Sequence, residues 1–366
     1  MLRPGSRPLR RTLVPLTAVL ALAVPASAQA AATVHLRGTA YEFNNVDVRL
    51  AGATIRVAED PRLHATVRPD GSYDLAVPAH AKVTPYIVAA GYKTIYLQTF
   101  TTDGEDLPNV NFQTPTIPIY QALAALLSVP LDQNGNLKQC AIVSTFSTVN
   151  VRALGFADFI AYGAHGVPGA TATTSPRAGA PIYFNASVLP DRSQKVSSKD
   201  GGVIWTGVPA GVYTIRAHAS KARFASFVAT CAPGRIVNAN PPWGLHQLAP
   251  ASPARVAATW RRAGDTVALR TLRATRLPAK VSVRVGCAGR GCPFTARMVT
   301  PAGDAADLRA ALPTGAIRLR SGQTLSVIVT APVTDGAVVR WKVGRTGTPS
   351  PRRLCVPLGL SRPRPC

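Results

Sequence analysis

The amino-acid sequence predicts an all-β protein, built from two tandem antiparallel β-sandwiches followed by a third, mainly-β domain. Two observations carry this prediction: short runs in which apolar and polar residues alternate, and a pattern that occurs twice. Each copy begins at a Gly-Ala pair, passes through an Asp-Gly turn and closes at Val-Pro-Ala, within residues 52–79 and 179–210. Short strands separated by Gly and Pro are typical of β-sandwiches.

Residues 1–30 have the pattern of a secretory signal peptide. A stretch with four arginines precedes an apolar run at residues 13–24, and small residues surround a cleavage site at Ala28–Ala30. The pair Arg10-Arg11 leaves both the general secretory and the twin-arginine route open. Because the apolar run is shorter than the ~20 residues of a membrane span, we expect cleavage, no later transmembrane segment, and a secreted, extracellular or cell-surface location.

The first sandwich is expected at residues 31–116. Val34 and Leu36 alternate with polar residues, as do Tyr73, Leu75 and Val77, and this period of two predicts half-buried strands. The strongest hairpin signal is Asp70-Gly71. A connector at residues 117–138 follows, where leucines at helical spacing predict a short helix over 118–129 that is docked on the protein's own core.

The second sandwich is expected at residues 139–248, and a stiff Pro/Ala linker at 249–254 separates it from a third domain at 255–366. Alternation around residues 281–285, 325–329 and 339–343 predicts strands in this last domain. Residues 304–312 are expected to form one short helix, with Asp304 as its N-cap.

The first sandwich resembles the carboxypeptidase regulatory-like modules of secreted bacterial proteins, which have a transthyretin-like (prealbumin-like) fold that is also described as carbohydrate-binding-like. The resemblance rests on residues 52–57, 70–75, 77–79 and 89–92, and more loosely on 160–232 for the second copy. It implies a seven- or eight-stranded sandwich and no particular ligand. The C-terminal region, with its Cys287–Phe294 segment, is similar to uncharacterised basic tails of secreted proteins from high-GC bacteria.

Six cysteines in an exported chain predict three disulfides. Order and spacing favour pairs within each domain: Cys140 with Cys231, Cys287 with Cys292, and Cys355 with Cys366. The alternative is a zinc site built from the last four cysteines. Their spacings lack the Cys-x2-Cys knuckles typical of structural zinc, so disulfides are favoured.

We expect no catalytic residues, no cofactor and no metal site. No histidine has a glutamate at the offsets of a zinc peptidase, and the sequence contains no Gly-x-Ser-x-Gly elbow, no phosphate-binding loop and no dinucleotide fingerprint. Two tryptophans, Trp205 and Trp243, are candidate carbohydrate contacts because an indole can stack on a sugar ring, whereas core packing is their more frequent fate.

Positive charge is concentrated at the C-terminal end. Residues 252–366 hold 20 basic and 4 acidic residues, whereas 31–251 hold 17 and 13. Arg284, Arg340 and Lys342 alternate with apolar neighbours and are candidate contacts for an anionic surface. Expected partners are anionic cell-wall polymers or polysaccharide, and not nucleic acid; the alternative is a solvated face that reflects arginine-rich codon use.

These observations favour a non-catalytic exported protein with a structural or adhesive role at the bacterial cell surface. Two alternatives stay open. One is a carbohydrate-binding protein that uses the second sandwich, and the other is an accessory part of an extracellular enzyme system.

Overall fold

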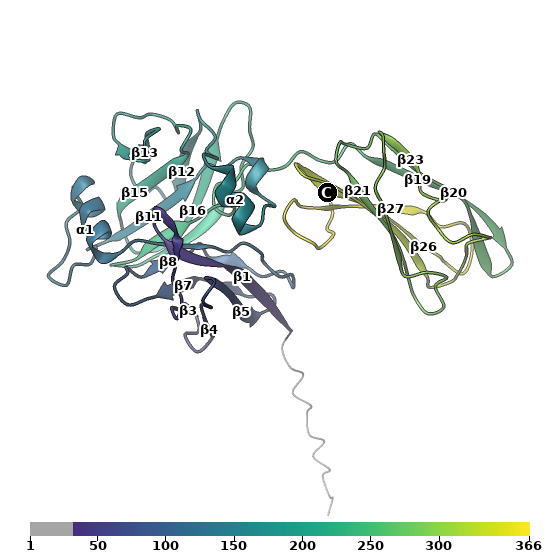
Figure 1. The fold of residues 1–366 in the computed structure, drawn as a ribbon, viewed down its shortest axis with the longest axis horizontal. Helices are drawn as coiled ribbons and strands as arrows, with labels where there is room; N and C mark the ends of the chain where they lie inside the picture. The colour runs from purple at the N-terminus through teal and green to yellow at the C-terminus, as the bar shows by residue number, and fades with distance from the viewer. Residues whose placement is uncertain (1–31) are drawn as a thin grey trace, which may run out of the picture. The chain divides into compact units, whose positions relative to one another are not determined.

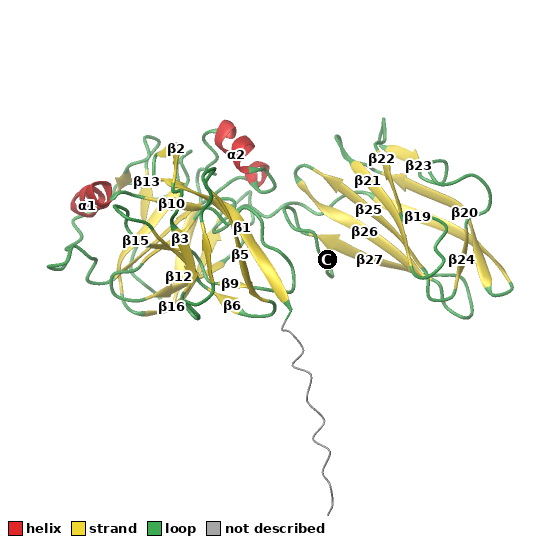
Figure 2. Cartoon of the chain, turned by 60° about the horizontal axis from the view of Figure 1, so that its bottom comes forward, coloured by secondary structure: helices red, strands yellow, loops and turns green. Residues whose placement is uncertain are grey.

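The computed structural model describes residues 32–366, and the expected signal peptide lies outside the described residues. The described chain is almost entirely β, with two short α-helices, as the sequence predicts (Figure 2). We call residues 32–116 module one, 139–248 module two and 255–366 the C-terminal unit. Each has a large hydrophobic core of its own. Most strand pairs are antiparallel, and the parallel pairs are β1–β10, β11–β18 and β18–β8.

Module one packs one sheet formed by β1, β2, β5 and β10 against strands of a second sheet (Figure 1). Leu36, Ile55 and Leu75 are fully buried between them. Its strands are β1 (Thr33–Glu42), β2 (Asn45–Arg49), β3 (Thr54–Val57), β4 (His64–Thr66), β5 (Ser72–Pro78), β6 (Lys82–Val83), β7 (Pro85–Val88), β8 (Ile95–Tyr96), β9 (Phe100–Thr101) and β10 (Phe112–Thr114).

The turn at Asp70-Gly71 forms as predicted, but it does not close a hairpin. The Asp70 carboxylate accepts a hydrogen bond from the Ser72 backbone N–H at 2.9 Å, and Gly71 has a φ of +82°. The strands on either side pair with different partners, β4 with β3 and β5 with β1. The turn therefore carries the chain from one sheet of the sandwich to the other.

Module two follows helix α1 (Ile117–Leu126), whose first turn is capped by the Thr116 hydroxyl. Tyr120 and Ala124 of this helix are buried, whereas Leu126 is exposed, so the apolar stripe is narrower than predicted. A helix that the sequence did not indicate is α2 (Phe156–Tyr162), next to the 3-10 turn η1 (Val149–Val151). The strands of module two are β11 (Cys140–Thr145), β12 (Thr171–Ser175), β13 (Ile182–Phe184), β14 (Pro190–Asp191), β15 (Gly202–Val208), β16 (Gly211–His218), β17 (Phe227–Cys231) and β18 (Ile236–Ala239).

One nine-stranded sheet runs through both modules, in the order β14-β13-β15-β11-β18-β8-β7-β3-β4. Strand β18 lies between β11 of module two and β8 of module one. Side chains alternate between the faces of a strand, and Val237 packs in the core of module two whereas Ile236 packs against that of module one. The two cores therefore lie on opposite faces of the shared sheet.

The C-terminal unit is a sandwich of a four-stranded and a five-stranded sheet. Val283, Val327 and Trp341 are buried between these sheets, as the alternation predicts. The expected helix at residues 304–312 is wrong, because residues 305–307 pair with β20 as an edge strand and a turn follows. The strands are β19 (Arg255–Ala263), β20 (Thr266–Thr275), β21 (Ser282–Ala288), β22 (Ala296–Val299), β23 (Ala305–Asp307), β24 (Arg318–Arg320), β25 (Thr324–Ala331), β26 (Thr334–Lys342) and β27 (Pro351–Val356).

The three predicted disulfides are confirmed. Cys140–Cys231 joins β11 to the end of β17, and so connects the two sheets of module two. Cys287–Cys292 closes the turn after β21, and Cys355–Cys366 ties the last residue to β27. Disulfides of this kind are typical of proteins outside the reducing cytosol.

The last residues also contact module one through a buried carboxylate. Glu105 is 6% exposed, and its side chain accepts hydrogen bonds from the backbone N–H groups of Ser361 and Arg362. Its second oxygen pairs with the Arg364 guanidinium at 2.9 Å. Burial of a carboxylate is costly unless it is paired and hydrogen-bonded, and these contacts satisfy both oxygens.

Candidate functional site

Trp205, one of the two candidate carbohydrate contacts, is in the core. It lies on β15 between the two sheets of module two and is fully buried. Val203, two residues earlier on the same face of the strand, is buried as well. The indole therefore offers no face to a sugar, and for Trp205 the prediction of a surface contact is wrong.

The Trp243 side chain also contacts other parts of the protein. Its indole N–H donates to the Pro108 carbonyl at 3.0 Å, its ring meets Phe100 edge-on at 5.2 Å, and the Arg152 guanidinium lies 4.1 Å from the ring centre. The neighbouring Asn240 amide donates to a backbone carbonyl of module one. This Pro-flanked segment joins the modules, so a solvent-facing role for Trp243 is not supported.

His246, which follows this segment in the sequence, is expected to make the protein less stable in acid. Burial, followed by the positive charge of Arg152, lowers the pKa of His246 to about 3. An unfolded imidazole titrates near about 6.5, so between these values the unfolded chain binds the additional proton and stability falls as pH falls. We expect the free energy of unfolding to decrease by about 1 kcal/mol per pH unit across this window.

Urea unfolding at pH 7, 6 and 5 checks this expectation, with His246→Gln as the comparison. The variant lacks the titrating group, so its stability should change less with pH than that of the parent. Parallel pH profiles for the two proteins would contradict the assignment to His246.

The predicted cationic residues do share a surface. Arg284 on β21 and Arg340 and Lys342 on β26 lie on the outer face of the five-stranded sheet, opposite the buried Val283 and Val339 and on the same face as a small apolar cluster around Val338. Arg352 on β27 lies directly across from Arg340. We call these four residues the arginine face. Among residues 32–366, one cation of the C-terminal unit forms an ion pair with a carboxylate. This cation is Arg364, which pairs with Glu105 and lies outside the arginine face.

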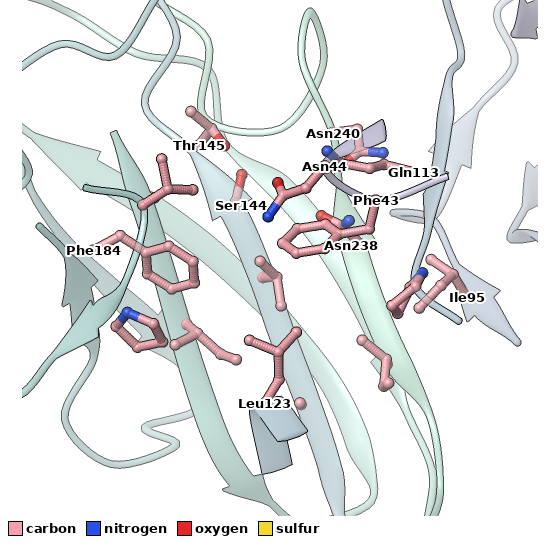
Figure 3. A pocket seen from close by; sticks show the side chains of 18 of the residues that line it. Phe43, Asn44, Ile95, Gln113, Leu123, Ser144, Thr145, Phe184, Asn238 and Asn240 are labelled. Atoms are coloured by element: carbon pink, nitrogen blue, oxygen red, sulfur yellow. The ribbon is translucent and has the colours of Figure 1, made fainter. Parts of the chain in front are cut away.

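An apolar pocket of about 320 Å³ lies on the shared sheet (Figure 3). Its floor is the face of β11, β15 and β18 that points away from the core of module two, and it includes Val143, Ile204 and Ile236. These side chains would face water in an ordinary sandwich. Here neighbouring segments cover them in part, because module one lies on this side of the sheet.

Four segments form the walls of the pocket. Phe43 comes from the β1–β2 turn of module one, and Leu123 and Leu127 come from α1. Phe184 and Val188 come from the β13–β14 hairpin, and α2 contributes two further residues. The sequence signal for this site is the absence of alternation: Cys140-Ala141-Ile142-Val143 and Val203-Ile204-Trp205 are continuous apolar runs, which indicate strands covered on both faces.

Polar groups gather at one end of the pocket. The side chains of Asn44, Gln113, Thr145 and Asn238 lie there together (Figure 3). Asp200, from the Asp-Gly turn of the second copy of the sequence pattern, also lines the pocket, and its carboxylate accepts a hydrogen bond from the Gly202 N–H at 3.0 Å. Burial raises the pKa of Asp200 above its usual value.

Two further observations concern residues 32–366. No group of three or more His, Cys, Asp or Glu side chains is arranged there to hold a metal ion. None of their helices combines the length and the apolar character needed to cross a membrane.

No protein-family model matches the chain, and no curated protein does. Similar solved structures include the Bacillus anthracis TIE protein, with 13% identity and a TM-score of 0.18 over 86% of this chain and 49% of that one. A Streptococcal ancillary pilin has 10% identity and a TM-score of 0.19 over 88% of this chain and 95% of that one.

The major pilin subunit BcpA of Bacillus cereus has 9% identity and a TM-score of 0.18 over 60% of this chain and 69% of that one. The chain spans about half the length of the TIE protein. At TM-scores this low, neither fold nor function follows from these likenesses.

Proposed function

We propose that this is an exported, non-catalytic protein with a structural or adhesive role at a bacterial cell surface, where its C-terminal unit attaches to anionic polymers. The observation that carries the proposal is the arginine face, whose four cations line one sheet of a unit with 20 basic and 4 acidic residues. Delocalised charge of this kind attracts polyanions with little specificity. The resemblance of module one to regulatory-like modules of secreted proteins belongs to the same proposal.

The opposite sheet of the unit supports a broad attachment. Arg255 and Arg273 lie on the outer face of β19 and β20, where they alternate with the buried Val256 and Ala274. Both outer faces of the sandwich therefore carry exposed cations. A polymer could be held from either side, which suits retention at a charged surface better than recognition of one small anion.

The expected result is binding to purified cell-wall fragments that weakens steeply with salt. The Debye length falls from about 10 Å at 0.1 M to about 3 Å at 1 M, so contacts between exposed charges are screened. The triple variant Arg284→Ser/Arg340→Ser/Lys342→Ser should bind about tenfold more weakly at low salt, because three exposed contacts of about 0.5 kcal/mol each sum to that factor. Co-sedimentation measures both effects.

The matched control is Lys195→Ser/Lys199→Ser/Arg216→Ser, which removes the same charge from exposed positions of module two. It should bind nearly as well as the parent. Equal losses in the two triple variants would mean that net charge alone matters, and binding that ignores salt would remove the basis of the proposal.

A further inference from the structure

The apolar pocket on the shared sheet has the dimensions of a ligand site. Its volume of about 320 Å³ falls in the range of ~300–1,000 Å³ typical of small-molecule sites. Ile204 on its floor and Leu127 in its wall are each 7% exposed, whereas Val188 in the same lining is 44% exposed, so the pocket is a partly open hollow with an apolar base. Binding of an apolar molecule in such a hollow is favourable because apolar surface is removed from water.

The charge of the lining limits what can bind. None of the lysines and arginines of residues 32–366 lines this pocket. The carboxylate in the lining is that of Asp200, and it lies close enough to His165 for the two side chains to interact electrostatically. An anionic ligand would lose its hydration without gaining a cationic partner, and burial of an unpaired charge is costly. Fatty acids, phosphates and acidic sugars are therefore disfavoured.

The polar end of the pocket provides hydrogen-bonding groups without charge. The side-chain amides of Asn44, Gln113 and Asn238 line the pocket at this end (Figure 3), and none of the three residues is fully buried, so the amides are accessible to a ligand. Asn44 is held there by a left-handed backbone conformation, with a φ of +61°, in the β1–β2 turn. An amide both donates and accepts, so these groups suit a neutral polar atom of a ligand.

We propose that this pocket binds a neutral, mainly apolar small molecule that carries a hydrogen-bonding group such as an amine, amide or hydroxyl. The apolar body lies over Val143 and Ile204 between α1 and the β13–β14 hairpin, and the polar group meets the amides of module one and β18. This binding is separate from polymer attachment by the arginine face, because no cation takes part in it.

A matched pair of fluorescent probes tests the proposal with the full chain. N-phenyl-1-naphthylamine is neutral and apolar and has one N–H, and 1-anilinonaphthalene-8-sulfonate is the same molecule with an added sulfonate. We expect saturable fluorescence enhancement of the neutral probe with one site per chain, unaffected by 1 M salt. The sulfonate should displace the neutral probe at least tenfold more weakly, whatever it binds elsewhere on this basic protein.

Two variants localise the site, and one serves as control. Leu123→Glu places a charge in the wall, and Val143→Phe fills the space from the floor. Each should weaken binding of the neutral probe at least tenfold. Leu126→Glu makes the first change three residues later on the same helix, at a side chain that is 55% exposed and outside the lining, and it should leave binding unchanged. Thermal unfolding of each variant confirms that it is folded.

Several results would overturn the proposal. These are absence of saturable binding to the parent, full binding by both lining variants, equal loss in Leu126→Glu, or displacement by the sulfonate at the same concentration as the neutral probe. A failure of the protein to bind cell-wall polymers would not affect these measurements, because they are made without polymer and at high salt.

Discussion

Removal of the Cys140–Cys231 disulfide, in the variant Cys140→Ala/Cys231→Ala, is expected to lower the free energy of unfolding by about 4 to 5 kcal/mol. The bond spans 91 residues and connects the two sheets of module two. Its loss frees a long loop in the unfolded chain and so favours the unfolded state by chain entropy. Urea unfolding of the oxidised parent and of the variant measures the difference.

The Cys287→Ala/Cys292→Ala variant is the matched control. That disulfide spans 5 residues, and the same entropy relation gives about 2 kcal/mol. A larger loss for the short loop than for the long one would show that local packing, and not loop length, determines the contribution of these bonds.

Replacement of Trp243 by Ala is expected to cost about 3 to 5 kcal/mol of stability, as for other large aromatic side chains in well-packed sites. The variant loses the edge-on contact with Phe100 and the hydrogen bond to the Pro108 carbonyl. It also exposes Arg152, which is 5% exposed in the parent and has no carboxylate partner among residues 32–366; burial lowers its pKa to about 10.

The Trp243→Phe variant keeps a ring in place and should cost much less. A double-mutant cycle with Arg152→Met isolates the contact between guanidinium and indole, for which we expect about 1 to 2 kcal/mol. If Trp243→Ala cost under about 1 kcal/mol, the segment would be a surface loop after all, and stacking on a sugar would again be a reasonable role for this tryptophan.

Local features of the fold could be predicted from the sequence, and long-range ones could not. The period of two around Leu75, Val283 and Val339 indicates which side chains are buried, because successive side chains of a strand point to opposite faces of the sheet. Cysteine pairing within each domain follows from chain order. The Asp70-Gly71 turn was predicted as a hairpin because sequence identifies a turn and not the partners of the strands beside it.

The contrast between local and long-range features also explains why the sequence did not predict the candidate site. Trp205 and Trp243 were selected for their chemistry, and the structure uses both for packing. The apolar pocket combines the β1–β2 turn, α1 and three strands of module two, and their proximity depends on a sheet that crosses the expected boundary at residues 117–138. The available signal was the pair of unbroken apolar runs at residues 140–143 and 203–205, which shows that both faces of a strand are covered but not what covers them.

Strand β18 limits how this chain could have been assembled by gene shuffling. A self-contained module can be duplicated, lost or recombined because its neighbours do not depend on it. Here Val237 faces one core and Ile236 faces the other. Deletion of module two would therefore expose part of the core of module one and leave the edge of β8 free to pair with other chains. Residues 32–248 are therefore expected to be inherited together.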